Sequence, residues 1–363
     1  MNKKGLDVCL FSAPENIYYL TGLNHWGFFA LHVLIVPLKG TISLVIRQME
    51  TVVVANQLGS RVEFRGYRDS MAPSIKVAEV LHELEINKSQ IGMDMRTLYR
   101  SYTDTKEIVD QFPKTKWIDI QEVMNEFMFI KSDLEIAAVR QAASITEMMM
   151  EAAIRTTAAG VNENEVAAEV YKAMVLAGGE YPSFGPFIRP KTRLGEEHGA
   201  WGQSILKEDD TLFVELAGCY KRYHAPMGRF IYLKPPEGIK KVVSVTLEAF
   251  AAVTDTMKPG VTAHDVYSAW QKVVDKAGIP EYRRHHSGYK VGISFPPTWM
   301  TGGNRYSLRE ESEMELKAGM EFHVLSWLVG SKLGDYFVSD TVLVTPTGSE
   351  VLTKTSQNIL TAK

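Results

Sequence analysis

Glu215 is the residue of this sequence whose type and position point most directly to chemistry. It lies in the stretch "TLFVELAG", where apolar neighbours predict a buried strand. A buried carboxylate without a partner is costly, so Glu215 must be ion-paired, protonated or functional. Beside a cationic substrate it could attack a carbon atom as a nucleophile or deprotonate a water molecule as a general base. A structural ion pair, for example with Arg229, is the alternative.

Two histidines are candidate acid/base residues. His198 stands 17 residues before Glu215, and an imidazole with a pKa near neutrality can both donate and accept a proton. An ordinary hydrogen bond within a loop is the other interpretation of His198. His323 alternates with Phe322 and Val324 in "EFHVLSW", so it faces away from them if this stretch is a strand. It is either a second acid/base or a buried histidine with satisfied hydrogen bonds.

Three polar residues after Glu215 are candidates for substrate binding. Tyr223 follows Glu215 across a predicted turn, where simple packing within the turn is the alternative. Arg229 could bind a substrate carboxylate with two parallel hydrogen bonds. An internal salt bridge from Arg229 to Glu215 or Asp340 is equally compatible with the sequence, and Asp340 is itself a candidate substrate contact.

Composition limits the possible partners and location. The chain has 363 residues, 45% of them hydrophobic and 23% charged, with a formal net charge of −3. This balance argues against nucleic-acid binding and anionic-membrane binding, and favours a small-molecule substrate. Two cysteines, no apolar signal core in "MNKKGLDVC" and no apolar run long enough to span a bilayer predict a cytoplasmic protein.

The chain divides into two predicted domains. In the first third, strands at "LDVCLFS", "HVLIVPL", "TISLVI" and "QIGMDM" alternate with an amphipathic helix at "SIKVAEVLHEL". A new helix begins at "KSDLEIAAVRQAA", where Ser132 and Glu135 form a capping-box pattern. We therefore expect an α/β domain over residues 1–129 and a second domain over residues 130–363.

The second domain contains an internal repeat. "TTAAGVNENEVAAEVYKAMVLAGG" is matched by "TMKPGVTAHDVYSAWQKVVDKAGI" at an offset of 100 residues, with Gly160 equivalent to Gly260. Each helical pair is followed by three predicted strands: "FIRP", "TLFVELA" and "RFIYL" in the first half, "VGISF", "EFHVLSW" and "DTVLV" in the second. Two αα-βββ halves predict one curved antiparallel sheet backed by helices, with a pocket on its concave face.

These landmarks resemble the creatinase/aminopeptidase P (M24) superfamily over nearly the whole chain. "NIYYLTGL" is similar to the N-terminal signature of its creatinase and prolidase branch, and "LKAGMEFHV" and "DTVLVTPTGSEVLT" are similar to its last strands. The resemblance implies a two-domain α/β protein with a creatinase-like N-terminal domain and a C-terminal pita-bread catalytic domain. It also implies a homodimer, in which Trp26 of one subunit contributes to an aromatic wall over the pocket of the other.

The peptidases of this superfamily hold two metal ions, and the resemblance implies that those ligands are lost here. Their positions fall on Glu215, Pro226, Tyr289, Leu325 and Ser339. Proline and leucine offer no side-chain ligand, and tyrosine and serine are poor ligands for such a site. We therefore expect no metal and no other cofactor. The Tyr289 hydroxyl should point into the vacated space as a substrate contact, unless the ring only fills it.

Within the superfamily, the chain most resembles the metal-free ectoine hydrolases. The segments that carry this resemblance are "FVELAGCYKRYHAPMGR", "SGYKVGISFPPTW" and "GMEFHV"; the chain departs from those enzymes at "SDT", which contains Asp340. The resemblance implies hydrolysis of a C–N bond in a cyclic amidine, with Glu215 as nucleophile or base and His198 as acid/base. Phe184 is a candidate pocket wall, because aromatic faces suit a cationic ring.

The sequence thus predicts a metal-independent hydrolase that acts on a small amidine or guanidino compound. Ectoine is the first expected substrate class and creatine-like compounds are the next. Two alternatives remain open: a metallopeptidase of the Xaa-Pro type, and a catalytically inactive binding protein of the same fold.

Overall fold

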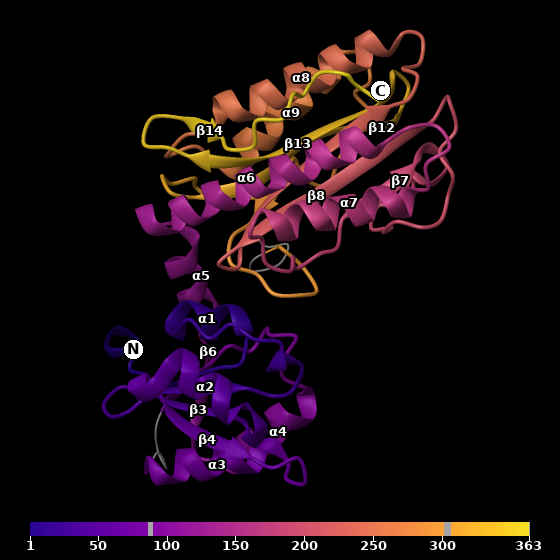
Figure 1. Ribbon diagram of the computed structural model, residues 1–363. Coiled ribbons are helices and arrows are strands. Elements are labelled where there is room, and N and C mark those ends of the chain that lie inside the picture. The colour runs from indigo at the N-terminus through magenta and orange to yellow at the C-terminus, as the bar shows by residue number, and fades with distance from the viewer. Residues whose placement is uncertain (86–89, 301–305, 363) are drawn as a thin grey trace. The chain divides into compact units, whose positions relative to one another are not determined.

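The computed structural model describes residues 1–85, 90–300 and 306–362, and Figure 1 traces the chain. The chain forms two compact units, Met1–Met128 and Phe129–Lys363. The boundary expected from the sequence lies one residue later, so that Phe129 belongs to the second unit. Each unit is built around its own sheet.

The first unit is a mixed α/β domain. Its six-stranded sheet has the order β4-β3-β2-β1-β5-β6, in which β1 is antiparallel to β2 and parallel to β5. The strands are β1 (Val8–Phe11), β2 (Val33–Pro37), β3 (Ser43–Arg47), β4 (Glu63–Tyr67), β5 (Gln90–Met93) and β6 (Lys116–Asp119). The helices are α1 (Pro14–Thr21), α2 (Thr51–Leu58), α3 (Pro73–Glu83), α4 (Tyr102–Asp110) and α5 (Gln121–Phe129), the last of which ends at the first residue of the second unit. The strands and the helix predicted for this part are all confirmed.

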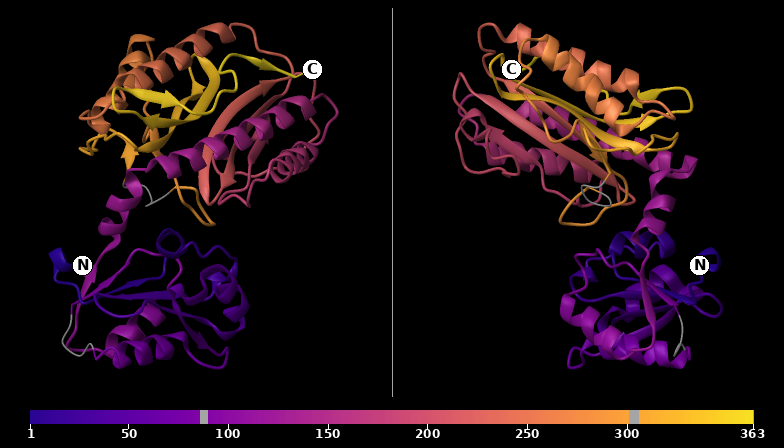
Figure 2. Two further views of the ribbon diagram at one scale, coloured as in Figure 1. Left: turned by 60° about the vertical axis from the view of Figure 1, so that its left-hand side comes forward. Right: turned by 180° about the vertical axis from the view of Figure 1, so that it is seen from behind.

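The second unit is one curved sheet with helices on one face (Figures 1 and 2). Its main path has the order β11-β10-β12-β13-β9-β8-β7, with β14 paired to β13 and β15 paired to β9. The strands are β7 (Phe187–Pro190), β8 (Thr211–Tyr220), β9 (Tyr223–Tyr232), β10 (Gly288–Lys290), β11 (Ser307–Leu308), β12 (Glu321–Ser331), β13 (Gly334–Val344), β14 (Ser349–Val351) and β15 (Leu360–Thr361). The helices are α6 (Asp133–Thr156), α7 (Glu163–Leu176), α8 (Ile239–Thr256) and α9 (Ala263–Lys276).

The predicted repeat is confirmed by matching helix starts. Capping boxes begin α6 at Ser132, α7 at Asn162 and α9 at Thr262. Asn162 and Thr262 also form equivalent isolated bridges, to Ile205 and to Glu315. The helical pair α6–α7 packs on β8 and β9, and α8 packs on β12 and β13. The predicted pita-bread architecture is therefore the observed one.

One predicted strand is wrong. The stretch "VGISF" was expected to be the first strand of the second half, but that strand is β10, which ends just before it at Lys290. Gly292 follows with a φ of 151°, a conformation that residues with a side chain rarely adopt. Ile293 then forms an isolated bridge to Tyr223, outside the named strands. Residues 291–295 are buried, but they form a loop and not a strand.

The β8–β9 hairpin decides which side chains face the helices. Its two-residue turn, Lys221 and Arg222, has φ values of 48° and 61°, as a tight hairpin turn of the favoured twist requires. This register places Glu215 opposite Gly228 and Val214 opposite Arg229. Val214 packs with α6 and α7, so Glu215 faces the opposite, helix-free side.

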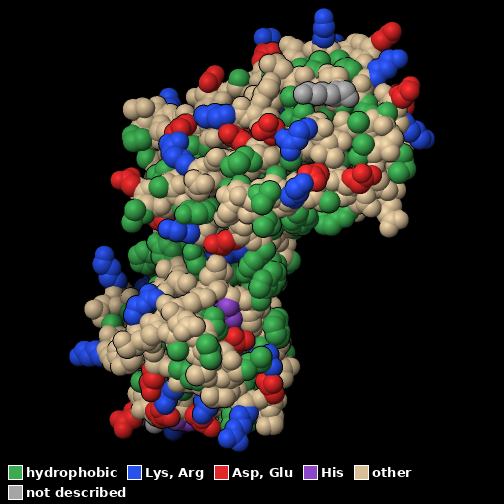
Figure 3. All heavy atoms as spheres, in the orientation of Figure 1, with side chains coloured by type: hydrophobic (Ala, Val, Ile, Leu, Met, Phe, Trp, Pro, Cys, Tyr) green, Lys and Arg blue, Asp and Glu red, His purple; other side chains and the backbone are tan. Residues whose placement is uncertain are grey.

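Surface features agree with the charge balance of the sequence. On the face of each unit seen in Figure 3, Lys and Arg side chains are interspersed with Asp and Glu side chains. Among the helices that the structure describes, none is long and apolar enough to cross a membrane.

Candidate active site

Glu215 lies in a register row that crosses five strands of the sheet, from Phe187 of β7 to Leu325 of β12. Gly228 of β9 pairs with both Glu215 of β8 and Ser339 of β13, and Ser339 pairs with Leu325 of β12. A Cβ atom on Gly228 would lie 2.3 Å from Cε1 of Phe337 and 2.8 Å from Oγ of Ser339. Glycine at this position therefore lets the side chains of β13 pack beside Glu215.

A buried hydrogen-bond network lies next to Glu215. Nε1 of Trp299 donates to the hydroxyl of Tyr289 at 2.9 Å. The hydroxyl of Tyr289 is hydrogen-bonded to Nδ1 of His323 at 2.8 Å, and Nε2 of His323 is hydrogen-bonded to Oγ of Ser339 at 2.7 Å. Nε2 of His323 also lies 3.7 Å from Oε1 of Glu215. The network joins β10, β12 and β13 to the acid on β8.

Burial sets the charge state of this network. His323 is fully buried, and desolvation holds its pKa well below 6.5, with smaller contributions from His286 and Arg229. The ring is therefore neutral at physiological pH. Because an indole can only donate, a consistent assignment has the Tyr289 hydroxyl donating to Nδ1 and the Nε2–H donating to Ser339. Burial and the nearby Glu215 carboxylate raise the pKa of Tyr289 well above 10, so it stays a phenol.

Glu215 titrates near neutrality. Desolvation raises its pKa from 4.5 to about 7, the Arg189 guanidinium opposes the shift, and Glu197 adds to it. Only 9% of its side chain is exposed. A carboxyl poised near the working pH can act as a nucleophile or base once a cation stabilises its ionised form.

Aromatic side chains surround the acid on this face of the sheet. Phe187 pairs directly with Glu215 across β7 and β8. Its ring lies 5.8 Å from Trp299 and 5.3 Å from Phe184, and Phe184 packs edge-on against Trp299 at 4.8 Å. Phe213, two residues before Glu215, stacks on Phe337 at 5.2 Å. Phe184 is thus close to the site, and its role in binding a substrate stays a prediction.

His198 lies at the edge of this aromatic group. It is exposed, and its ring is 6.0 Å from that of Phe187, the cross-strand partner of Glu215. His198 is therefore on the same side of the sheet as the acid and open to solvent. The position suits a group that exchanges protons with water and with a substrate at Glu215.

Three cationic or titratable residues near the site were missed in the sequence. Arg189 is on β7, and His286 and Arg284 are in the basic run "YRRHH". The ring of His286 is 5.3 Å from that of Tyr289, and the guanidinium of Arg284 stacks 5.0 Å from the Trp327 ring. A signal existed for Arg189, since it alternates with Phe187 in the same short apolar strand.

Two of the predicted substrate contacts, Arg229 and Asp340, lie on the other face of the sheet. They form a fully buried ion pair with each other at 2.8 Å. Asp340 also accepts hydrogen bonds from Thr353 and Gln357. The prediction of a substrate clamp at Arg229 and Asp340 is corrected to the internal salt bridge that the sequence had left open.

Tyr223 is likewise on the face that carries the helices. Its hydroxyl donates to Oε1 of Glu135, in the first turn of α6, at 2.9 Å. The predicted substrate contact at Tyr223 is therefore corrected to a contact between the sheet and a helix. The physical reason is strand alternation, since Tyr223 shares its parity with Arg229 and not with Gly228.

Trp26 belongs to the first unit. Its ring stacks on Phe28 with centroids 5.8 Å apart, and the residue is 56% exposed. Its expected role over the pocket of a second subunit stays a prediction, as does the homodimer itself.

The positions expected for metal ligands do not form a metal site. Glu215 is the single carboxylate among them; Pro226, Tyr289, Leu325 and Ser339 occupy the rest. Within residues 1–85, 90–300 and 306–362, no cluster of three or more His, Cys, Asp or Glu side chains could hold an ion. The side chains of Tyr289 and Ser339 are already bonded to His323. This donor set does not fit a two-metal centre.

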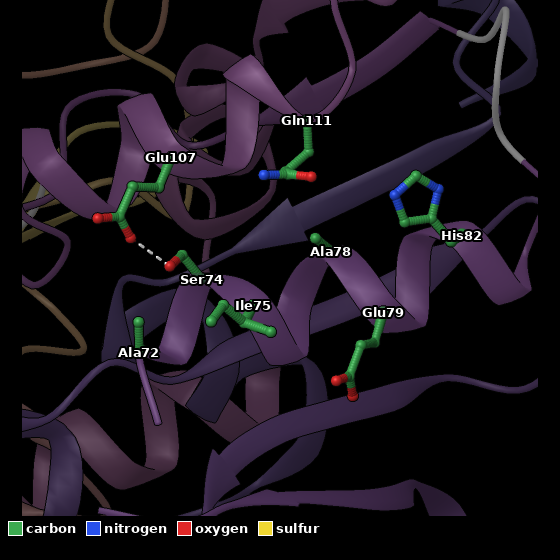
Figure 4. Close-up of a pocket in the computed structure, with 8 residues that line it drawn as sticks. All are labelled: Ala72, Ser74, Ile75, Ala78, Glu79, His82, Glu107 and Gln111. Carbon is green, nitrogen blue, oxygen red and sulfur yellow. Dashed lines mark hydrogen bonds between the residues drawn. The ribbon is translucent and has the colours of Figure 1, made fainter. Parts of the chain in front are cut away.

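A separate groove of about 300 Å³ lies between α3 and α4 of the first unit (Figure 4). Ser74 donates to Glu107 there, whereas Glu79, His82 and Gln111 are spread along the two helices. The polar groups do not converge on one point, so this groove lacks the features of a reaction site.

Comparison with known proteins identifies both parts of the chain. The pattern of metallopeptidase family M24 matches residues 137–346, and that of the creatinase/prolidase N-terminal domain matches residues 1–127. The ectoine hydrolase of Halomonas elongata is 28% identical over 97% of this chain and 92% of its own length. The Xaa-Pro dipeptidase of Pyrococcus horikoshii is 26% identical over 99% of this chain and 96% of its own. The crystal structure of a prolidase from Pyrococcus horikoshii superposes with a TM-score of 0.84 at 24% identity, over 99% of this chain and 97% of that one.

Proposed function

This chain belongs to metallopeptidase family M24, and from that premise we propose that it hydrolyses a non-peptide C–N bond in a small amidine or guanidino compound without a metal ion. Ectoine, a cyclic amidine, is the favoured substrate. The observation that supports the proposal is one buried carboxylate, Glu215, beside a hydrogen-bonded Tyr289–His323–Ser339 network. The resemblance to the superfamily implies that Glu215, Tyr289 and Ser339 stand at positions of metal ligands.

An amidinium cation suits this environment in two ways. It would add a second positive charge to that of Arg189, which would lower the raised pKa of the Glu215 carboxyl and favour its ionised form. Its charged amidine would also lie beside the rings of Phe187 and Trp299.

The net reaction consumes one water molecule. In the covalent route, a Glu215 oxygen attacks the amidinium carbon, the C–N bond breaks, and the leaving nitrogen takes a proton from His198. Water then gives one proton back to His198 and attacks the same carbon, which releases the Glu215 carboxylate and leaves an amide, while the second water proton goes to the freed amine. In the general-base route, Glu215 takes a proton from water, which attacks the carbon directly, and His198 again protonates the leaving nitrogen. His323 orients Ser339 and Tyr289 beside the carboxylate in both routes.

A hydrolysis screen tests this proposal. Ectoine, hydroxyectoine, creatine and Xaa-Pro dipeptides are incubated with the protein in the presence of a chelator, alongside Glu215→Gln and His198→Ala. We expect turnover of an amidine or guanidino compound, lost in Glu215→Gln and reduced about 10²- to 10⁴-fold in His198→Ala. A mass shift trapped on Glu215 would distinguish the covalent route. Failure to hydrolyse any of these non-peptide compounds would contradict the proposal.

A peptidase of the Xaa-Pro type is the second candidate, because the similarity to a dipeptidase is nearly as high as that to the ectoine hydrolase. The donor set argues against it, since Pro226 and Leu325 offer no ligand where such enzymes need one. Mn²⁺, Co²⁺ or Zn²⁺ that switched on cleavage of an Xaa-Pro dipeptide would favour this candidate. An inactive binding protein is the remaining alternative.

A further inference from the structure

Arg189 is a buried cation on the same face of the sheet as Glu215. It lies on β7, opposite Phe213 of β8, and none of its surface is exposed. Because Phe187 is opposite Glu215, Arg189 and Glu215 are diagonal neighbours across the strand pair. Such neighbours are about 7 Å apart, within the span of a small organic molecule.

Two of the three guanidinium nitrogens of Arg189 have no hydrogen-bond partner among the residues that the structure describes. Its Nη1 donates to the backbone carbonyls of Glu197 at 2.8 Å and Gly199 at 3.4 Å. Its Nε and Nη2 are buried and make no hydrogen bond within the described residues. Cζ of the guanidinium lies 4.1 Å from the centroid of the Phe213 ring. The two open nitrogens form the edge of a guanidinium that matches the two oxygens of a carboxylate.

Other buried arginines in this unit are saturated. Every side-chain nitrogen of Arg222 and of Arg229 donates to at least one acceptor. Burying a cation with unpaired donors is costly. A ligand that accepts hydrogen bonds from Nε and Nη2 of Arg189 would remove this cost. Burial lowers the pKa of Arg189 and the Glu215 carboxylate opposes this, but a guanidinium stays charged at neutral pH.

We infer that the Nε–Nη2 edge of Arg189 binds a carboxylate of the substrate, so that the substrate is a zwitterion with an amidinium or guanidinium at one end and a carboxylate at the other. The inference rests on the proposed hydrolase function and narrows its substrate class. Glu215 and Arg189 then present one negative and one positive group on adjacent strands, a charge pattern complementary to such a molecule. A cationic ring without a carboxylate would leave Arg189 unpaired, and the site should reject it.

The test compares three ligands that differ at one group: ectoine, its carboxamide, and the same ring without the carboxylate, 2-methyl-1,4,5,6-tetrahydropyrimidine. kcat and KM are measured for each with the unaltered protein, with Arg189→Gln and with Arg189→Lys. Arg140→Gln is the matched control, since Arg140 is an exposed residue of α6 that pairs with Glu350. Calorimetric binding of the same ligands is measured in parallel.

We expect the unaltered protein to favour ectoine over both analogues by about 100-fold or more in kcat/KM, mainly through KM. Arg189→Gln should lose about the same factor toward ectoine and discriminate little among the three ligands. Arg189→Lys should recover part of this factor. The control Arg140→Gln should behave like the unaltered protein. Since Arg189 is buried and its variants could misfold, the analogue comparison on the unaltered protein stands by itself.

Three results would overturn the inference. They are equal turnover of ectoine and the ring without a carboxylate, discrimination that survives in folded Arg189→Gln, and no binding of any of the three ligands. The hydrolase proposal fails separately if ectoine binds in a manner dependent on its carboxylate and on Arg189 but is not hydrolysed. In that case the anion subsite stands and the proposed reaction does not.

Discussion

Nε2 of His323 lies 3.7 Å from Oε1 of Glu215, while both nitrogens of the same ring are engaged in hydrogen bonds to Tyr289 and Ser339. The histidine is therefore held in place beside the acid and kept neutral by burial. In our account it positions the network around Glu215, and the exposed His198 exchanges the proton.

The pH dependence of activity should follow Glu215. Because its pKa is raised to about 7 by burial, kcat/KM for ectoine should fall below about pH 7 as the carboxylate is protonated in the free enzyme. Glu197 contributes to the raised pKa of Glu215, so Glu197→Gln should move the acidic limb of the pH profile, where kcat/KM falls, to lower pH. A kcat/KM profile from pH 5 to 9 measures both. A limb that stays at the pH of an ordinary carboxyl, or a shift to higher pH in Glu197→Gln, contradicts the assignment.

Replacing the acid should stabilise the protein while abolishing its activity. The pKa of Glu215 is about 7 in the folded protein and near 4.5 when unfolded, so the folded state binds more protons between these values. Its contribution to stability is therefore present below pH 4.5 and is lost as pH rises through about 7. Glu215→Gln should raise the free energy of unfolding at pH 8 by up to about 3 kcal/mol and by less at pH 5. Urea denaturation at both pH values measures this; a destabilised variant at pH 8 would argue for an internal ion pair at Glu215.

The Tyr289 hydroxyl should matter for both stability and rate. Tyr289→Phe leaves Nε1 of Trp299 and Nδ1 of His323 without their partner in a buried setting. We expect a loss of about 1–3 kcal/mol in the free energy of unfolding and a lower kcat. Tyr102→Phe, at a residue 79% exposed, is the control and should change neither. An unchanged Tyr289→Phe protein would mean that the ring only fills space.

Arg229 and Asp340 should be structural. Removing one partner of this buried pair, in Arg229→Met or Asp340→Asn, should cost about 3–5 kcal/mol because it leaves an unpaired buried charge or an unfilled acceptor. The double variant should lose less than the sum of the two. Chemical denaturation of all four proteins gives the coupling, and kcat/KM per folded molecule should stay near that of the parent. A higher KM with an unchanged free energy of unfolding would instead favour the predicted substrate clamp at Arg229 and Asp340.

The β8–β9 hairpin, which carries Glu215, shows how much of the fold and of the site could be predicted from the sequence. The apolar alternation around Glu215 and the capping boxes at Ser132, Asn162 and Thr262 are local signals, and the elements they predicted are present. The face of Arg229 and Tyr223 depends on the register of β8 with β9, which a two-residue turn at Lys221 and Arg222 determines. Without the location of that turn, residues on either face were equally good candidates.

Arg189 and His286 show the other limit. Each is joined to the site through tertiary contacts, Arg189 across the β7–β8 pair and His286 by packing on Tyr289. The alternation of Arg189 with Phe187 could place both on one face of a strand, but it could not show that Glu215 lies beside them. A histidine in a basic run carries no local signal of its contact with Tyr289. The unpaired edge of Arg189 is visible only when every donor in the fold is matched to its acceptor.

The most direct test of the central claim is the turnover of ectoine before and after exhaustive chelation, with the metal content of the same sample measured by mass spectrometry. We predict an unchanged kcat with far less than one metal ion per chain. Activity that disappears on chelation and returns at two Mn²⁺, Co²⁺ or Zn²⁺ ions per chain would contradict it.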